Sequence, residues 1–190
     1  SFSGHKIYAP KGVGVLFVKK GTPLIRQTDG GSQENNLRAG TENVPYIVGL
    51  GKAVELAVKN RVKELNRLKI LQTSLISQLS LIPQITLTGH PTQRAPHIAS
   101  FIIDGVEGEA VVLYLSVLGI AVSTGAACTS KSFTSSHVLS ACGIPPEKSH
   151  GSLRISLGKD TTQDDIDYAV SCIKKVVAKQ DDNSVVNGFW

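Results

Sequence analysis

Lys6 is the first residue of this chain whose surroundings favour chemistry. It ends the run Ser3-Gly4-His5-Lys6 and is followed by the turn-forming Pro10-Lys11-Gly12. A rigid turn can aim an amine, and an amine attacks an aldehyde when burial or a neighbouring cation lowers its pKa. His5 and Lys11 are the candidate neighbours. Most lysines are solvated surface residues, so this motif alone leaves both interpretations of Lys6 open.

Cys128 is the second candidate, because its surroundings cannot bury it well. Residues 123–127 and 129–132 are nearly all small or polar. An exposed thiol with a cation nearby favours the thiolate, which is the reactive form. The alternative is an inert core cysteine. Cys142 and Cys172 are interpreted as core or surface residues.

Arg154 is the third candidate, because it lies in a β-like run at residues 153–157. A buried charge is costly unless it is paired. The planar guanidinium suits a carboxylate that it can bind through two hydrogen bonds. We therefore expect Arg154 to bind an anion, which is either a substrate carboxylate or an Asp or Glu of the protein.

The elements that must position these residues begin with a loop-rich segment, 1–44, with one short strand at 14–18. The paired glycines and asparagines of residues 30–36 predict irregular structure there. From Pro45 to Leu79, apolar residues recur every three or four positions. This spacing predicts one long amphipathic helix, or two helices broken near Asn60.

Beyond residue 80 the pattern alternates between short β-rich runs and helical runs. Thr162, with Asp165 three residues later, is typical of a helix start. The alternation predicts a compact α/β layer structure. Strands are expected at 85–88, 98–103, 120–123 and 153–157, and helices at 107–118, 135–141 and 162–179.

Composition narrows the class of protein. Of the 190 residues, 41% are hydrophobic and 18% charged, as in ordinary soluble proteins. The net charge is +5, but the basic residues are scattered and only 5% of residues are aromatic, which argues against nucleic acid and fits an anionic small molecule. No apolar run reaches the roughly 20 residues of a membrane span. Three cysteines without a C-x-x-C pair argue against a metal site and favour a reducing compartment.

Four blocks, in this order, resemble the NifS/IscS-type cysteine desulfurases, a branch of the class V aminotransferase-like enzymes. The blocks are S-G-H-K-x-Y-A-P-K-G-V-G-V-L-F-V, G-G-S-Q-E-N-N-L-R-A-G-T-E-N-V, S-T-G-A-A-C-T-S and S-L-R-I-S-L-G. The resemblance implies the α/β, PLP-dependent transferase-like fold (fold type I), of which this chain is the C-terminal half. It assigns 1–44 to the end of the large domain that binds pyridoxal 5'-phosphate (PLP), 45–80 to a connecting helix, 81–180 to the small C-terminal α/β domain, and 181–190 to a flexible tail.

The same resemblance implies roles for single residues. Lys6 holds PLP covalently, while Ser3 and His5 bind the cofactor phosphate. Thr41 reaches the phosphate of the neighbouring subunit's cofactor, so the enzyme is a homodimer.

For the reaction, the resemblance implies that Arg154 binds the carboxylate of L-cysteine and Cys128 takes the sulfur as a persulfide, which leaves L-alanine. The sulfur then passes to an acceptor or scaffold protein for iron–sulfur cluster assembly or tRNA thiolation. We expect no nucleic-acid or membrane partner, and a cytoplasmic location, or a mitochondrial one in a eukaryote.

Other functions stay open at this point. Selenocysteine lyases act on the same carboxylate and amine, and a C-terminal fragment can serve as a non-catalytic interaction or dimerisation module. An aminotransferase without sulfur chemistry is disfavoured by Cys128. The chain has no methionine and begins inside a motif, so we expect a fragment of a longer protein. Since the family's remaining cofactor contacts lie in the preceding half, we expect this chain alone to bind PLP weakly and to turn over no cysteine.

Overall fold

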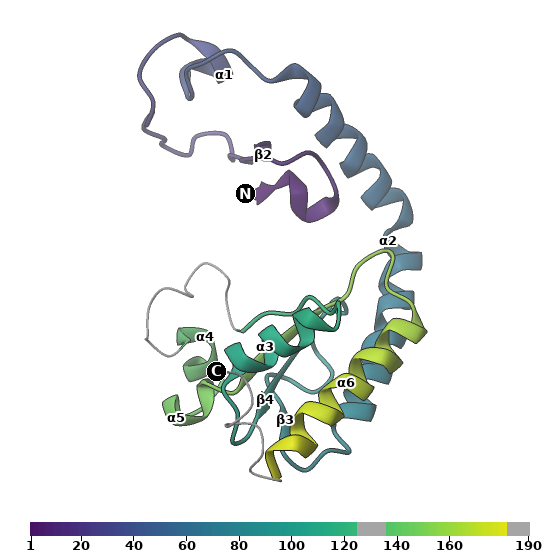
Figure 1. Ribbon diagram of the computed structural model, residues 1–190. Coiled ribbons are helices and arrows are strands. Elements are labelled where there is room, and N and C mark those ends of the chain that lie inside the picture. Colours follow the sequence, from purple (N-terminus) through teal and green to yellow (C-terminus); the bar gives the residue numbers. More distant parts are fainter. Residues whose placement is uncertain (125–135, 182–190) are drawn as a thin grey trace. The chain divides into compact units, whose positions relative to one another are not determined.

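The computed structural model describes residues 1–124 and 136–181, with side chains described as far as residue 178 (Figure 1). The chain divides into two compact units, Ser1–Lys63 and the part from Glu64 onward. Helix α2 (Val44–Leu79) contributes its first half to one unit and its second half to the other.

The first unit is built around two short antiparallel strands, β1 (Phe2–Ser3) and β2 (Gly14–Val15), with the 3-10 helix η1 (Gly4–Ile7) between them. Its buried cluster is small and consists of Ala9, Leu50 and Ala53 with Ile7 and Val13 packed against it. The expected strand at 14–18 was too long, because β2 ends at Val15 and the described residues offer no strand to pair beyond it.

Residues 26–36 form a loop that the side chain of Arg26 holds together. Its guanidinium donates hydrogen bonds to the carbonyls of Thr28 and Gly30 and to Asn36 Oδ1, each at 2.6 Å. Helix α1 (Gln33–Asn36) is one turn within this loop, and Glu34, Asn35 and Asn36 there have positive φ values of 50°, 54° and 63°. These angles are left-handed, so the expected irregular structure is confirmed.

Helix α2 runs without interruption from Val44 to Leu79, so the alternative with a break near Asn60 is wrong. Pro45 lies in its first turn, where a missing N–H costs nothing. The carbonyl of Asn43 accepts from the N–H groups of Tyr46 and Ile47 at 3.1 and 3.0 Å. The helix therefore begins where the sequence pattern predicts.

The second unit is an antiparallel sheet in the order β3-β4-β5 with helices against it (Figure 1). The strands are β3 (Ile85–Leu87), β4 (Ile98–Ile103) and β5 (Ser152–Ser156). Helices α3 (Gly108–Val117) and α6 (Gln163–Asp181) and the second half of α2 enclose the core with the sheet face of Ala99, Phe101 and Ile103. Two short helices, α4 (His137–Ala141) and α5 (Pro146–Ser149), precede β5. An α/β layer structure was expected, and this is one.

The predicted strand at 120–123 is wrong. Only Ser123 pairs, in an isolated bridge with Arg154. Ile120 and Val122 pack against the core of the second unit without extending the sheet, so their β-favouring side chains are used for packing. The other predicted strands and helices of this unit agree with the structure to within two residues at each described end.

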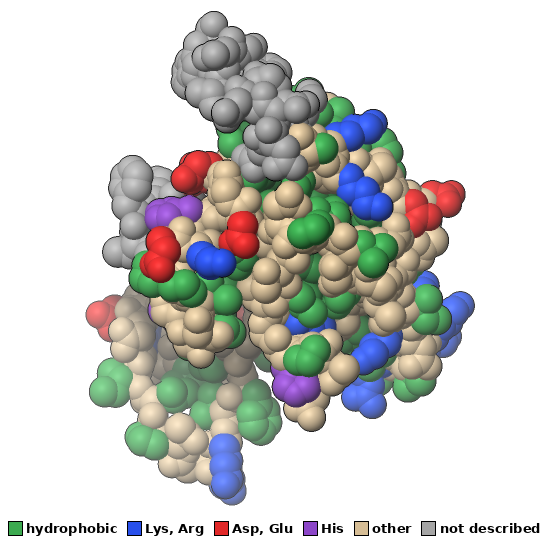
Figure 2. All heavy atoms as spheres, turned by 90° about the horizontal axis from the view of Figure 1, so that it is seen from below, with side chains coloured by type: hydrophobic (Ala, Val, Ile, Leu, Met, Phe, Trp, Pro, Cys, Tyr) green, Lys and Arg blue, Asp and Glu red, His purple; other side chains and the backbone are tan. Residues whose placement is uncertain are grey.

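On the face drawn in Figure 2, Lys and Arg side chains lie at several separate places. None of the helices in the described part of the chain combines the length and apolar character of a membrane span.

Candidate functional site

The turn that carries Lys6 is held tightly at its backbone. The N–H of Gly4 donates to the carbonyl of Val13 at 2.8 Å, and the N–H of Ala9 donates to the carbonyl of Gly4 at 3.1 Å. A Cβ at the buried Gly4 would lie 3.0 Å from that Val13 oxygen and 3.1 Å from a methyl of Leu50. The chain leaves the turn through Tyr8 at φ 67°. The backbone under Lys6 is thus fixed although the Lys6 side chain is exposed.

Three of the predicted site residues come together on this turn. Ser3, His5 and Lys6 are all exposed and lie at or within η1. The Ser3 hydroxyl makes no capping hydrogen bond to η1, so it is not used by the helix it precedes. A hydroxyl and an imidazole can donate to a phosphate, and an amine can bind an aldehyde. The donor set of this turn fits a phosphorylated aldehyde such as PLP.

Thr41 lies elsewhere in the first unit, between the loop that Arg26 holds and the start of α2. It follows Gly40, whose N–H donates to Gln33 Oε1 at 3.1 Å and whose φ is 102°. Thr41 is exposed, so its hydroxyl can be reached by another chain.

Arg154 belongs to the second unit and lies at the centre of β5, opposite Ser100 of β4. Its Nε is buried and has no hydrogen-bond partner among the residues that the structure describes. The ion pairs within that same part of the chain join other residues. A buried guanidinium nitrogen without a partner is costly, so this geometry favours an anionic ligand over an internal Asp or Glu.

Cys128 lies outside the described residues. The other two cysteines are described: Cys142 is exposed just after α4, and Cys172 lies on α6 with its side chain buried in the core. The sequence left open which of the two is a core residue and which a surface residue, and the structure places Cys172 in the core and Cys142 at the surface.

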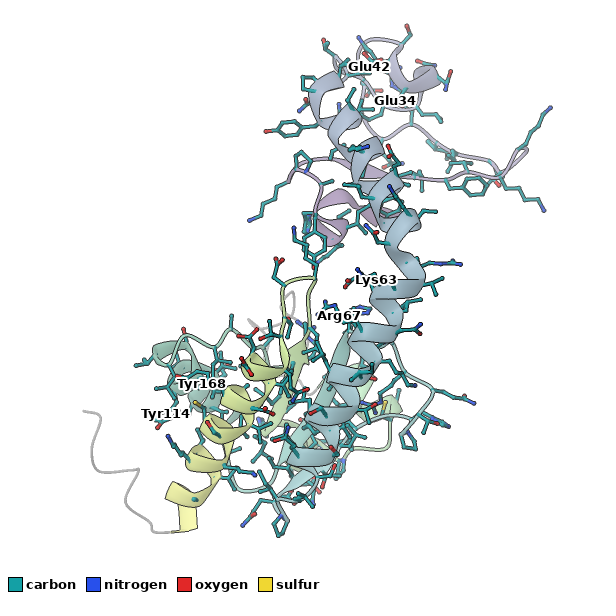
Figure 3. All side chains as sticks on the ribbon, turned by 90° about the vertical axis from the view of Figure 1, so that its right-hand side faces the viewer. Glu34, Glu42, Lys63, Arg67, Tyr114 and Tyr168 are labelled. Carbon is teal, nitrogen blue, oxygen red and sulfur yellow. The ribbon has the colours of Figure 1, made fainter. Side chains whose placement is uncertain are left out.

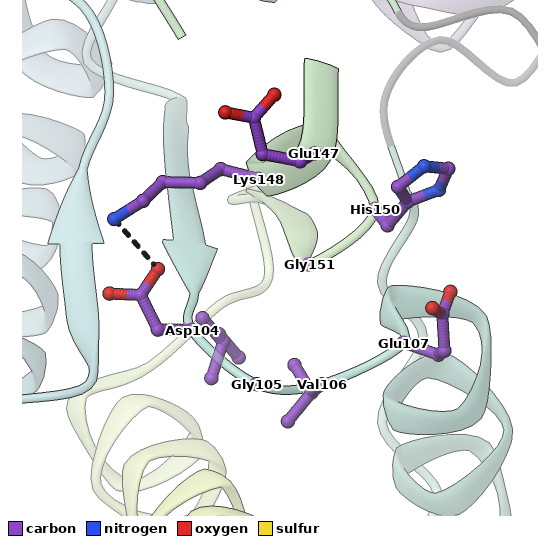
Figure 4. A pocket seen from close by; sticks show the side chains of 9 residues that line it. Asp104, Gly105, Val106, Glu107, Glu147, Lys148, His150 and Gly151 are labelled. Carbon is purple, nitrogen blue, oxygen red and sulfur yellow. Dashed lines mark ion pairs between the residues drawn. The ribbon is translucent and has the colours of Figure 1, made fainter. Parts of the chain in front are cut away.

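The second unit also has a pocket of about 230 Å³ that the sequence analysis did not predict (Figure 4). It is lined by residues 103–107, 147–148 and 150–151, and Lys148 forms an ion pair with Asp104 at 3.2 Å across it. It contains none of the predicted site residues. In the described part of the chain, no group of three or more His, Cys, Asp and Glu could hold a metal ion.

Comparison with known proteins places these residues in context. The family model "Aminotransferase class-V" matches residues 1–169. The chain is 46% identical over 180 residues to the cysteine desulfurase IscS of Dictyoglomus turgidum, covering 94% of this chain and 46% of that protein. It is 43% identical over 185 residues to the cysteine desulfurase NifS of Azotobacter vinelandii, covering 94% of this chain and 45% of that protein. The chain thus spans about half the length of the curated relatives it matches.

Solved structures of NifS-like proteins are also similar to this chain. A NifS-like protein superposes with a TM-score of 0.83 at 33% identity, over 93% of this chain and 45% of its own. A NifS-like protein from Rickettsia africae superposes with a TM-score of 0.73 at 28% identity, over 82% of this chain and 40% of its own.

Proposed function

Because the chain belongs to the aminotransferase class-V family, we propose that it is the C-terminal half of a PLP-dependent cysteine desulfurase. The complete enzyme converts L-cysteine to L-alanine and leaves a persulfide on Cys128. The observation that carries this proposal is the fixed turn that presents Ser3, His5 and Lys6 together to solvent. The similarity to proteins named cysteine desulfurases supports the choice of reaction.

In this proposal Lys6 holds the cofactor aldehyde, and Ser3 and His5 donate to its phosphate. Thr41 donates to the phosphate bound by the second subunit of a homodimer. PLP, when bound, supplies an electron sink that allows the α-proton of the substrate to leave. The Lys6 amine would be set free when the substrate amine takes its place on the aldehyde, and the free amine would then carry that proton to and from the α-carbon.

Arg154 binds and orients the substrate. The buried Nε without a partner among the described residues supports this role, because a carboxylate can accept from Nε and a neighbouring guanidinium N–H at once. Fixing the carboxylate also restricts where the substrate sulfur lies.

Cys128 takes the sulfur. Its thiolate forms the new sulfur–sulfur bond while the substrate's carbon–sulfur bond breaks and leaves its electron pair on the carbon side, which is protonated and released as L-alanine. The persulfide then passes to an acceptor or scaffold protein for iron–sulfur cluster assembly or tRNA thiolation. Thiolate chemistry of this kind fits a reducing compartment such as the cytoplasm.

The test uses this chain co-expressed with the part of the Dictyoglomus turgidum relative that it does not match. We expect alanine from L-cysteine with the unsubstituted chain, and no alanine above background with Lys6→Ala or Cys128→Ala. Cys142→Ala is the matched control and should keep the activity. A complex that assembles but makes no alanine, or a Lys6→Ala variant that stays active, would rule the proposal out.

A further inference from the structure

Helix α3 begins at a residue that has no room for a side chain. The N–H of Gly108 donates to the carbonyl of His150 at 2.8 Å. A Cβ at Gly108 would lie 2.6 Å from the Ser152 carbonyl oxygen, 2.9 Å from the His150 carbonyl oxygen and 2.9 Å from Thr124 Cγ2. Figure 4 shows the start of α3, just after Glu107, with His150 on the neighbouring segment. Contacts this short to two backbone oxygens cannot be relieved by rotating a side chain.

The two segments next to Gly108 are joined by the isolated β-bridge between Ser123 and Arg154. The N–H of Arg154 donates to the Ser123 carbonyl at 2.7 Å, and the N–H of Ser123 donates back to the Arg154 carbonyl at 3.2 Å. Thr124 directly follows Ser123, and Ser152 precedes Arg154 by two residues on β5. A side chain at Gly108 would therefore meet the segments on both sides of the bridge.

We infer that Gly108 is a positioning residue that holds Ser123 against Arg154. A side chain at this point must push β5 or the Ser123–Thr124 segment away from α3, and the bridge connects those two. Its significance for catalysis rests on the proposed function. The chain reaches Cys128 four residues after Thr124, so the bridge sets where the segment that carries the thiol starts relative to the guanidinium that binds the substrate. Small changes in such a distance reduce reaction rates strongly.

The first test measures backbone amide hydrogen exchange by NMR in the 190-residue chain, with and without Gly108→Ala. We expect exchange at the Ser123 and Arg154 amides to rise at least tenfold, while Phe101 in the central strand β4 changes less than threefold. Equal acceleration at all three amides would mean that Gly108 serves only stability, and unchanged exchange would mean that it positions nothing. Either result overturns the inference.

If Gly108→Ala does not fold, the double variant with Thr124→Ser, which removes one of the three close contacts, is measured in the same way.

The matched control is Gly51→Ala on α2, where a Cβ would meet no atom within 4 Å. It should leave the Ser123 and Arg154 amides unchanged.

The second test measures turnover in the co-expressed complex. For Gly108→Ala we expect kcat to fall at least tenfold with KM for L-cysteine changed less than threefold, because Arg154 still binds the carboxylate. A normal kcat would overturn the inference. An unsubstituted complex without activity would refute the proposed function, and the exchange measurement would then decide the role of Gly108 by itself.

Discussion

Thr162 and Asp165 cap the first turn of α6 by reciprocal hydrogen bonds. The N–H and the hydroxyl of Thr162 both donate to Asp165 Oδ2 at 2.8 Å, and the N–H of Asp165 donates back to the Thr162 hydroxyl oxygen at 3.2 Å. This arrangement satisfies N–H groups that the helix itself cannot. It fixes where α6 begins, and α6 covers one side of the core of the second unit.

The capping pair should make stability depend on pH. The backbone N–H of Thr162, and then its hydroxyl, lower the pKa of Asp165 below the ordinary 3.8. A lowered pKa in the folded state means that the stabilisation is complete above pH 4 and is lost as the pH falls through the folded value. We expect Asp165→Asn to lower the melting temperature by a few degrees at pH 7 and by less at pH 3. Asp164→Asn, in the same turn, is the control and should lower the melting temperature at pH 7 by less than Asp165→Asn does. Equal decreases for the two variants at pH 7 would contradict the account.

Arg67 should stabilise the loop that follows β5. Arg67 lies on the second half of α2 (Figure 3). It donates to the carbonyls of Thr161 at 2.5 Å and Gly158 at 2.8 Å, beside its ion pair with Glu64. A lysine keeps the charge but cannot reach two carbonyls with a planar fork. We expect Arg67→Lys to lower the free energy of unfolding by about 1 kcal/mol, measured by urea denaturation. Arg61→Lys, exposed on the same helix, should cost nothing measurable, and an equal effect of both would show that the loop contacts contribute nothing.

Gln72 should contribute more to the free energy of unfolding than Arg67 does, because its side chain is buried. Its side-chain amide donates to the carbonyls of Ala95 at 2.7 Å and Ile98 at 2.6 Å, and the residue is only 2% exposed. Gln72→Leu leaves both carbonyls without this donor, so we expect a loss of about 2–4 kcal/mol. Urea denaturation measures it against Gln78→Leu, which removes the surface contact to Asp167. A loss at Gln72 no larger than that at Gln78 would contradict the role of burial.

The first unit should depend on the rest of the family fold. Phe17 is 83% exposed and Ile25 84%, while its buried cluster is built mainly on two alanines and one leucine. A core this small gives the first unit only marginal stability by itself. We expect the isolated chain to show fast amide exchange over residues 1–43 and weak PLP absorbance. When the unmatched part of the Dictyoglomus turgidum relative is supplied, the exchange should become slower and the absorbance stronger. Slow exchange over residues 1–43 in the isolated chain would show that the first unit needs no partner.

Periodicity predicted much of this fold. The apolar stripe from Pro45 to Leu79 predicted α2, and the Thr162–Asp165 spacing predicted the start of α6. The comparisons confirm the predicted family resemblance and the α/β, PLP-dependent transferase-like fold class. The strand at 120–123 failed because a run of β-favouring residues does not show whether a partner strand lies beside it, and Val122 packs into the core instead.

The site was predictable in part. The short motif around Lys6 brought Ser3 and His5 onto the same turn, because residues this close in sequence share local structure. The lack of room for a side chain at Gly108 was not predictable, because Ser152 and Thr124, which close the space, are far from it in the sequence. A glycine in a helical run carries no signal of what packs against it.

The most direct test of the central claim is the position of sulfur after reaction. The complex is exposed to L-cysteine without an acceptor, free thiols are blocked, and peptides of this chain are analysed by mass spectrometry. The account predicts one added sulfur atom on the peptide that contains Cys128, absent from the Lys6→Ala variant. Added sulfur only on Cys142 or Cys172, or on none of the three cysteines while alanine is still formed, would contradict it.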